Sequence, residues 1–145
     1  MTGAWLGREL LARPVRIRGI QLGRPVDLVV DPASWRVIGL DVRCGDGVLR
    51  FLPLAAARVR GDEVEVRSAL LLLDEGDTSF YRRGTSSLRR LHGAPVTERG
   101  EPAGPLRDVV VSPDGTITAV EVEDGRRLRT GAGVAVGVPG RATAA

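Results

Sequence analysis

The sequence predicts an all-β protein made of two tandem small β-barrels that are related by internal duplication. Two observations lead to this prediction. A stretch near the N-terminus returns 81 residues later, and short runs of apolar residues recur with turn residues between them. Strands that recur at spacings of about 8 to 12 residues are typical of all-β meanders and barrels. We therefore expect helix only as single turns.

The duplication is clearest between residues 8–32 and 89–113, where 11 of 25 aligned positions are identical. Similarity at a fixed period indicates a repeated structural unit. The repeat-equivalent residues to which we assign structural roles are Gly19, Gly23, Asp27 and Pro32 in the first copy and Gly100, Gly104, Asp108 and Pro113 in the second. The predicted organisation is a first copy over 1–73, a polar linker over 74–87, a shorter second copy over 88–138 and a disordered tail over 139–145.

Each copy is expected to begin with a single helical turn, within residues 5–11 and 86–91, and Ser86 or Ser87 can cap the second of these. The first strand then follows a proline and ends at Gly19 or Gly100, which turns the chain. The repeated motif forms the second strand. The remaining predicted strands cover 35–43, 48–54, 56–61 and 63–68 in the first copy and 116–123 and 133–138 in the second.

The second strand of each copy is apolar on both faces, over residues 28–30 and 109–111. A strand that is buried on both faces needs a second layer of structure. A unit of about 60 residues is also marginally stable alone. We therefore expect the outer apolar faces of the two copies to pack on each other within one chain. The alternative is a homodimer through the same surface.

The third strands show alternation. Ile38, Leu40 and Val42 share one face of the first copy, and charged residues such as Asp41 and Glu121 stand beside the apolar positions. Residues of opposite character at successive positions point to opposite faces of a strand. The pattern therefore predicts that Asp41 and Glu121 lie on the polar faces.

The motifs of the first copy resemble the PRC-barrel domain. This is a small β-barrel known from the cytoplasmic part of the photosynthetic reaction-centre H subunit and from the C-terminal half of a ribosome-maturation factor. The residues that carry the resemblance are Leu11, Pro14, Val15, Gly19, Leu22, Gly23, Asp27, Phe51, Leu52, Pro53 and Leu54. The second copy keeps the first half of this pattern, through residue 125, and lacks the Pro-centred strand. The resemblance implies a non-catalytic binding or scaffolding module that holds a protein partner.

The composition agrees with a non-enzymatic role. One His and one Cys cannot build a His-rich or Cys-rich metal site, and a chain without Lys has no phosphate-binding loop and no Schiff base. We predict no catalytic, cofactor or metal site, with His92 as a capping or solvated residue and Cys44 as a small apolar residue. The longest apolar run, residues 68–73, is far shorter than the roughly 20 residues that cross a bilayer. These features predict a cytoplasmic protein.

Asp27 and Asp108 are the acids to weigh as a functional pair, because they hold the same place in the two copies. Two equivalent carboxylates that meet across a pseudo-twofold axis can bind a cation or share a proton. The structural alternative is that each carboxylate accepts backbone hydrogen bonds and holds a turn at the strand entry. We favour the structural interpretation, since a residue that is repeated in a duplicated fold usually repeats a folding task.

All 21 basic residues are Arg, and the net charge is +3. The arginines that could contact RNA phosphates or anionic lipid headgroups are Arg82, Arg83, Arg89, Arg90, Arg126, Arg127 and Arg129, with Phe80 and Tyr81 as nearby aromatic residues. Such residues are also ordinary solvated surface when acids are mixed among them. The predicted function is therefore a protein-binding adaptor or scaffold. The alternatives are an RNA-associated or ribosome-assembly factor and peripheral association with a membrane complex.

Overall fold

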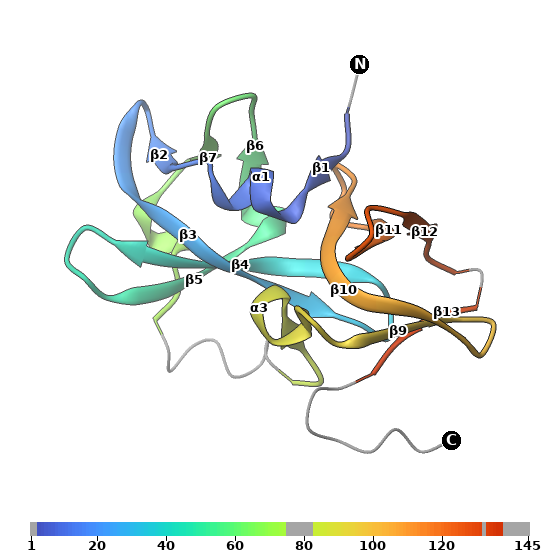
Figure 1. Ribbon diagram of the computed structural model, residues 1–145. Coiled ribbons are helices and arrows are strands. Elements are labelled where there is room, and N and C mark those ends of the chain that lie inside the picture. Colours follow the sequence, from blue (N-terminus) through green and yellow to red (C-terminus); the bar gives the residue numbers. More distant parts are fainter. Residues whose placement is uncertain (1–2, 75–82, 132, 138–145) are drawn as a thin grey trace.

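The computed structural model describes residues 3–74, 83–131 and 133–137, which form two curled β-sheets (Figure 1). The elements of the first copy are β1 (Trp5–Leu6), α1 (Gly7–Leu11), β2 (Val15–Ile17), β3 (Ile20–Asp31), β4 (Arg36–Cys44), β5 (Leu49–Pro53), the 3₁₀ turn η1 (Leu54–Ala56), β6 (Ala57–Val59), β7 (Val64–Val66) and the 3₁₀ turn η2 (Ala69–Leu71). Those of the second copy are β8 (Ser86–Ser87), α3 (Leu88–Leu91), β9 (Pro95–Glu98), β10 (Glu101–Val111), β11 (Ile117–Val122), β12 (Arg127–Arg129) and β13 (Val134–Val136). The all-β prediction is confirmed. The predicted tail over 139–145 and residues 75–82 of the predicted linker lie outside the described residues.

The two copies follow the same chain path. The strand order is β5-β4-β3-β2-β7-β6 in the first sheet and β12-β11-β10-β9-β13 in the second. The turns between β2 and β3 and between β9 and β10 are also alike, because Arg18-Gly19 and Arg99-Gly100 all have positive φ. Two successive residues with positive φ make the tight type I′ turn of a β-hairpin. The copies differ at their ends, where β7 pairs in parallel with β2 but β13 pairs antiparallel with β9.

The two copies exchange their first strands. β1 of the first copy pairs with β10 of the second, and β8 of the second copy pairs with β3 of the first. The paired residues are Trp5 with Val111, Leu6 with Val110, Ser86 with Val30 and Ser87 with Val29. These pairs are equivalent under the 81-residue repeat. Each copy therefore completes the sheet of the other, an arrangement that the sequence did not predict.

A short bridge joins the starts of β4 and β11. The N–H of Val37 donates to the carbonyl of Gly115 at 2.8 Å, and the N–H of Ile117 donates to the carbonyl of Trp35 at 2.7 Å. Between them, Arg36 and Thr116 form an isolated antiparallel bridge. After the one-residue gap in the repeat these positions are also equivalent, so a pseudo-twofold axis passes through this bridge.

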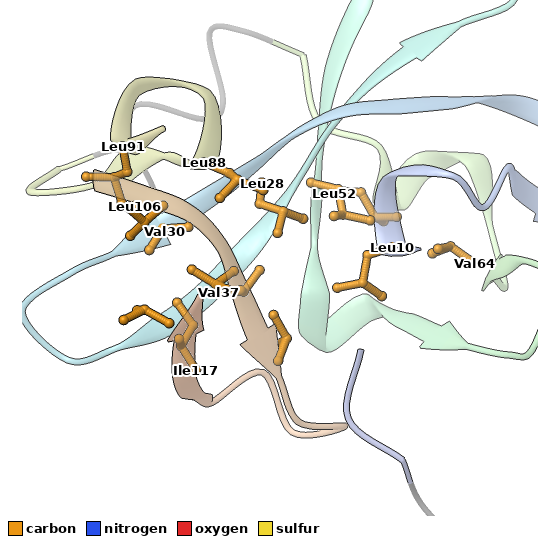
Figure 2. Close-up of a cluster of buried hydrophobic side chains, with 14 of the residues drawn as sticks. Leu10, Leu28, Val30, Val37, Leu52, Val64, Leu88, Leu91, Leu106 and Ile117 are labelled. Carbon is orange, nitrogen blue, oxygen red and sulfur yellow. The ribbon is translucent and has the colours of Figure 1, made fainter. Parts of the chain in front are cut away.

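The core is one cluster that draws side chains from both copies. Figure 2 shows three pairs with one residue from each copy, namely Val30 near Leu106, Val37 near Ile117 and Leu28 near Leu88, and all six residues are buried. The helices α1 and α3 each contact both long strands, β3 and β10. The second layer that the apolar second strands require is thus provided by the two helical turns together with the other copy.

The predicted alternation in the third strands is wrong at the acids. Asp41 is 8% exposed and Glu121 is 5% exposed, whereas Ile38 is only half-buried. The reason is that both faces of each strand are covered at this point, since Leu40 and Val42 beside Asp41 and Val120 and Val122 beside Glu121 are all buried as well. The partner strands contain register shifts at equivalent places, and these β-bulges leave Val26 and Arg107 unpaired.

Gly39 is a position where the sheet has no room for a side chain. A Cβ atom there would lie 2.5 Å from Cζ of Phe51 and closer still to the carbonyl oxygen of Leu52 on β5. We expect Gly39→Ala to lower the free energy of unfolding by about 1–3 kcal/mol, the usual cost of overpacking a core. Urea denaturation checks this. The matched control is Gly61→Ala, which meets nothing within 4 Å. Equal midpoints for both variants would contradict the close packing of β4 against β5.

Candidate functional site

Asp27 and Asp108 anchor the helical turn of the opposite copy. The Oδ1 atom of Asp27 accepts the N–H of Leu28 at 2.9 Å and the N–H of Arg89, in α3, at 3.1 Å. Asp108 accepts the N–H of Val109 at 2.7 Å and the N–H of Arg8, in α1, at 3.3 Å. Both carboxylates are therefore backbone acceptors, and in each case one donor comes from the other copy.

The Asp108 side also carries a network of arginines around two buried acids. The guanidinium of Arg8 lies 3.1 Å from Asp108 and 3.3 Å from Glu121, and Glu121 is also 3.6 Å from Arg107 and 3.4 Å from Arg127. The hydrogen bond with Glu121 raises the pKa of Arg8 above its ordinary value. A buried carboxylate without such partners would be costly to keep ionised. Within the described residues, no three His, Cys, Asp or Glu side chains come together as a metal site.

A hollow of about 510 Å³ opens beside this network, between α1 and α3. We call it the inter-repeat hollow. Its lining residues are Arg8, Leu11, Leu88, Arg89, His92, Arg107 and Asp108. Arg107 reaches the hollow because it is the unpaired residue of the bulge before Asp108. The hollow therefore combines leucines with three arginines that come from both copies.

The structure brings only one of the predicted arginines into this hollow. Arg83, Arg89, Arg90, Arg126, Arg127 and Arg129 are all exposed, and Arg82 lies outside the described residues, as do Phe80 and Tyr81. Arg126 is paired with Asp124 at 2.8 Å, and Arg127 is paired with Glu121. Arg89 lines the hollow together with Arg8 and Arg107, two residues that the sequence patterns did not indicate. The repeat could have indicated Arg8, since it is the equivalent of Arg89.

A second hollow, of about 600 Å³, lies at the end of the first copy. We call it the apolar hollow. It is lined by Leu22, Cys44, Gly45, Asp46, Arg50, Ala69, Leu70, Leu72, Leu73 and Asp74. Its far wall is held by two backbone hydrogen bonds between Phe51 and Leu73, of 2.9 and 2.7 Å. This wall belongs to the chain beyond β7, which has no counterpart among the described residues of the second copy.

The rim of the apolar hollow is charged and ordered by ion pairs. Arg50 contacts Asp46 at 2.9 Å and Asp74 at 3.1 Å. The hydrogen bonds from Arg50 lower the pKa of Asp46 to about 2. Arg50 thus links the β4–β5 turn to the segment after η2, across the mouth of the hollow.

The single Cys and the single His both lie at hollows. Cys44 is half-buried in the wall of the apolar hollow, with its Sγ atom 3.9 Å from the carbonyl of Val42. His92 is exposed at the C-terminal end of α3, and its N–H donates to the carbonyl of Leu88 at 2.9 Å. The predicted position of His92 at the end of a helical turn is confirmed. Ser87 caps the same turn by accepting the N–H of Arg90 at 3.2 Å.

The chain matches no protein-family model and no curated protein. In the described part of the chain, no helix combines the length and apolar character needed to span a membrane.

We expect Asp27→Ala and Asp108→Ala each to lower the free energy of unfolding by about 2 kcal/mol, since each removes the acceptor of hydrogen bonds that join the two copies. Urea denaturation followed by Trp fluorescence and by circular dichroism measures the change. Asp62→Ala is the control, because Asp62 is exposed and makes no contact of this kind. A midpoint for Asp27→Ala equal to that of the control would show that the anchor adds no stability.

Stability should also fall at acid pH. The pKa values of Asp46 and Asp114 are both lowered from 3.8 to about 2, in Asp114 mainly by hydrogen bonds from Ser112 and Thr116. Because the folded pKa is the lower one, the unfolded chain takes up protons first, and this contribution is lost as pH falls from about 4 to about 2. Urea midpoints measured across this range should fall less steeply in the Asp46→Asn, Asp114→Asn double variant. Identical slopes in the variant and the wild type would contradict this origin.

Proposed function

We propose that the chain is a non-catalytic adaptor of the PRC-barrel type, which binds a protein partner at the apolar hollow. The observation that carries this proposal is the exposure of Leu70, which is 87% exposed at the edge of that hollow. Leu70 shares the lining of the hollow with Leu22, Leu72 and Leu73, and contiguous apolar surface with a polar rim is typical of protein interfaces.

The surroundings of Leu70 support a preformed contact surface. Leu22, Leu72 and Leu73 line the floor and walls, while the ion pairs of Arg50 form part of the rim. In protein interfaces, the packed centre contributes most of the binding energy, and the polar rim around it keeps water out. A partner that inserts an apolar side chain between these leucines would fit this arrangement.

The charged residues favour a protein partner over RNA. Two of the predicted RNA-contacting arginines, Arg126 and Arg127, are engaged by Asp124 and Glu121. Among the described aromatic residues, Phe51 is buried and both tryptophans are partly buried. Binding of single-stranded nucleic acid usually relies on exposed aromatic platforms beside free cations. RNA binding and membrane association therefore become alternative outcomes of the experiment.

The test is capture of partners from the native cell with tagged full-length chain, after nuclease treatment and a wash at about 0.5 M salt. We expect a protein that is retained by the wild type and lost by Leu70→Asp, because a charge at the mouth of the hollow opposes apolar contact. Ile20→Asp is the matched control, since Ile20 is 67% exposed and does not line the hollow.

Three outcomes would contradict the proposal. Partners that disappear with nuclease would indicate RNA, and partners recovered only with membrane vesicles would indicate lipid. Equal retention by Leu70→Asp and Ile20→Asp would show that the apolar hollow is not the contact surface. Purified partner and chain, mixed and measured by calorimetry, then establish whether the contact is direct.

A further inference from the structure

We propose that the inter-repeat hollow is a second binding site, which takes an acidic segment of a protein that also carries an apolar side chain. This site is separate from the apolar hollow, and the two share no lining residue. Three features of the hollow support the proposal: its aliphatic floor, its positively charged rim and the fixed positions of its arginines.

The floor is aliphatic. Leu88 is 7% exposed and Leu11 is half-buried, and both line the hollow. Leu88 packs closely against Gly7, its equivalent in the first copy. A Cβ atom on Gly7 would lie 2.7 Å from a methyl group of Leu88. A well-fixed leucine at the base of a concave site provides a place for an apolar side chain of a partner.

The rim keeps an excess of positive charge. Three lining residues, Arg8, Arg89 and Arg107, are positively charged, and one, Asp108, is negatively charged, which leaves two positive charges. The buried Glu121 beside them is also paired with Arg127. Arg89 is the most available, because its guanidinium makes no hydrogen bond or ion pair with another described residue. An acidic partner is attracted to such a rim and loses affinity as salt screens the charges.

The remaining arginines are held in position. Arg8 is fixed by Asp108 and Glu121, and Arg107 extends from the bulge of β10 toward the same Glu121. Guanidinium groups that are already ordered lose less conformational entropy when they bind a carboxylate. Because the lining residues include no Phe, Tyr or Trp side chain, an acidic peptide with an aliphatic residue fits the hollow better than a nucleotide base does.

The test begins with a random dodecapeptide phage library selected on the folded full-length chain, with counter-selection on Arg89→Glu. We expect the enriched peptides to share acidic residues beside Leu, Ile or Val. The most enriched peptide, added to ¹⁵N-labelled chain, should shift the amide signals of Leu11, Leu88 and His92. Arg89→Glu should weaken this binding about tenfold, because reversing one contact charge removes roughly 1.4 kcal/mol.

The matched control is Arg129→Glu, which makes the same charge change on exposed β12, outside the hollow. If Arg89→Glu is poorly folded by thermal melting, Arg89→Gln replaces it. Leu70→Asp should leave peptide binding unchanged, so failure of the apolar hollow and failure of this site can be told apart.

The proposal is overturned by any of three results. The first is a library that yields no sequences able to discriminate wild type from Arg89→Glu. The second is an enriched peptide that shifts signals elsewhere on the chain or binds Arg129→Glu as weakly as Arg89→Glu. The third is a shift of the hollow signals by polyuridine or phosphatidylserine vesicles but not by the acidic peptide, which would assign the site to RNA or lipid.

Discussion

The reciprocal anchoring of α3 by Asp27 and of α1 by Asp108 is the constraint on which the two-copy structure depends. Both carboxylates are buried, at 9% and 2% exposure, and each needs donors to offset the loss of water. One of those donors is a backbone N–H of the other copy. Neither copy can bury its aspartate with full hydrogen bonding unless its sibling is in place. The strand exchange between β1 and β10 and between β8 and β3 follows from the same geometry, since each short strand leads directly into the anchored helical turn.

Symmetry is kept where this anchoring requires it and is relaxed elsewhere. The backbone bonds at the axis are equivalent in the two copies, yet the side chains around them differ. Gly7 and Leu88 occupy equivalent positions in the two copies. A larger residue at position 7 would collide with both Leu88 and Asp108. Trp35 and Gly115 share a left-handed backbone conformation although only the glycine adopts it without strain. The interface between the copies therefore has a symmetric backbone but asymmetric side chains.

The sequence was sufficient to predict the parts of the fold that local patterns encode. The strands, the turns at Gly19 and Gly100 and both helical turns follow from residue type and spacing over a few positions. The exchange of strands did not follow from such patterns, because pairing between residues far apart in the sequence, such as Trp5 with Val111 and Ser86 with Val30, leaves no trace in a periodicity. The burial of Asp41 and Glu121 was missed for a related reason: alternation along a strand shows which face is apolar, but it does not show that other parts of the fold cover the polar face too. Arg8 was overlooked as a site residue because its role depends on the opposite copy.

This division explains where binding surfaces can arise on a duplicated fold. Positions that hold the copies together are restricted in both, so substitutions there reduce stability. Positions that differ between the copies are free to acquire contacts, and each hollow includes such a difference. Arg107 replaces Val26 at the bulge beside the inter-repeat hollow, and Leu70 lies on chain that the described second copy lacks. A symmetric pair of copies would offer the same surface twice, whereas loss of symmetry outside the anchor gives a single chain two hollows of different chemistry.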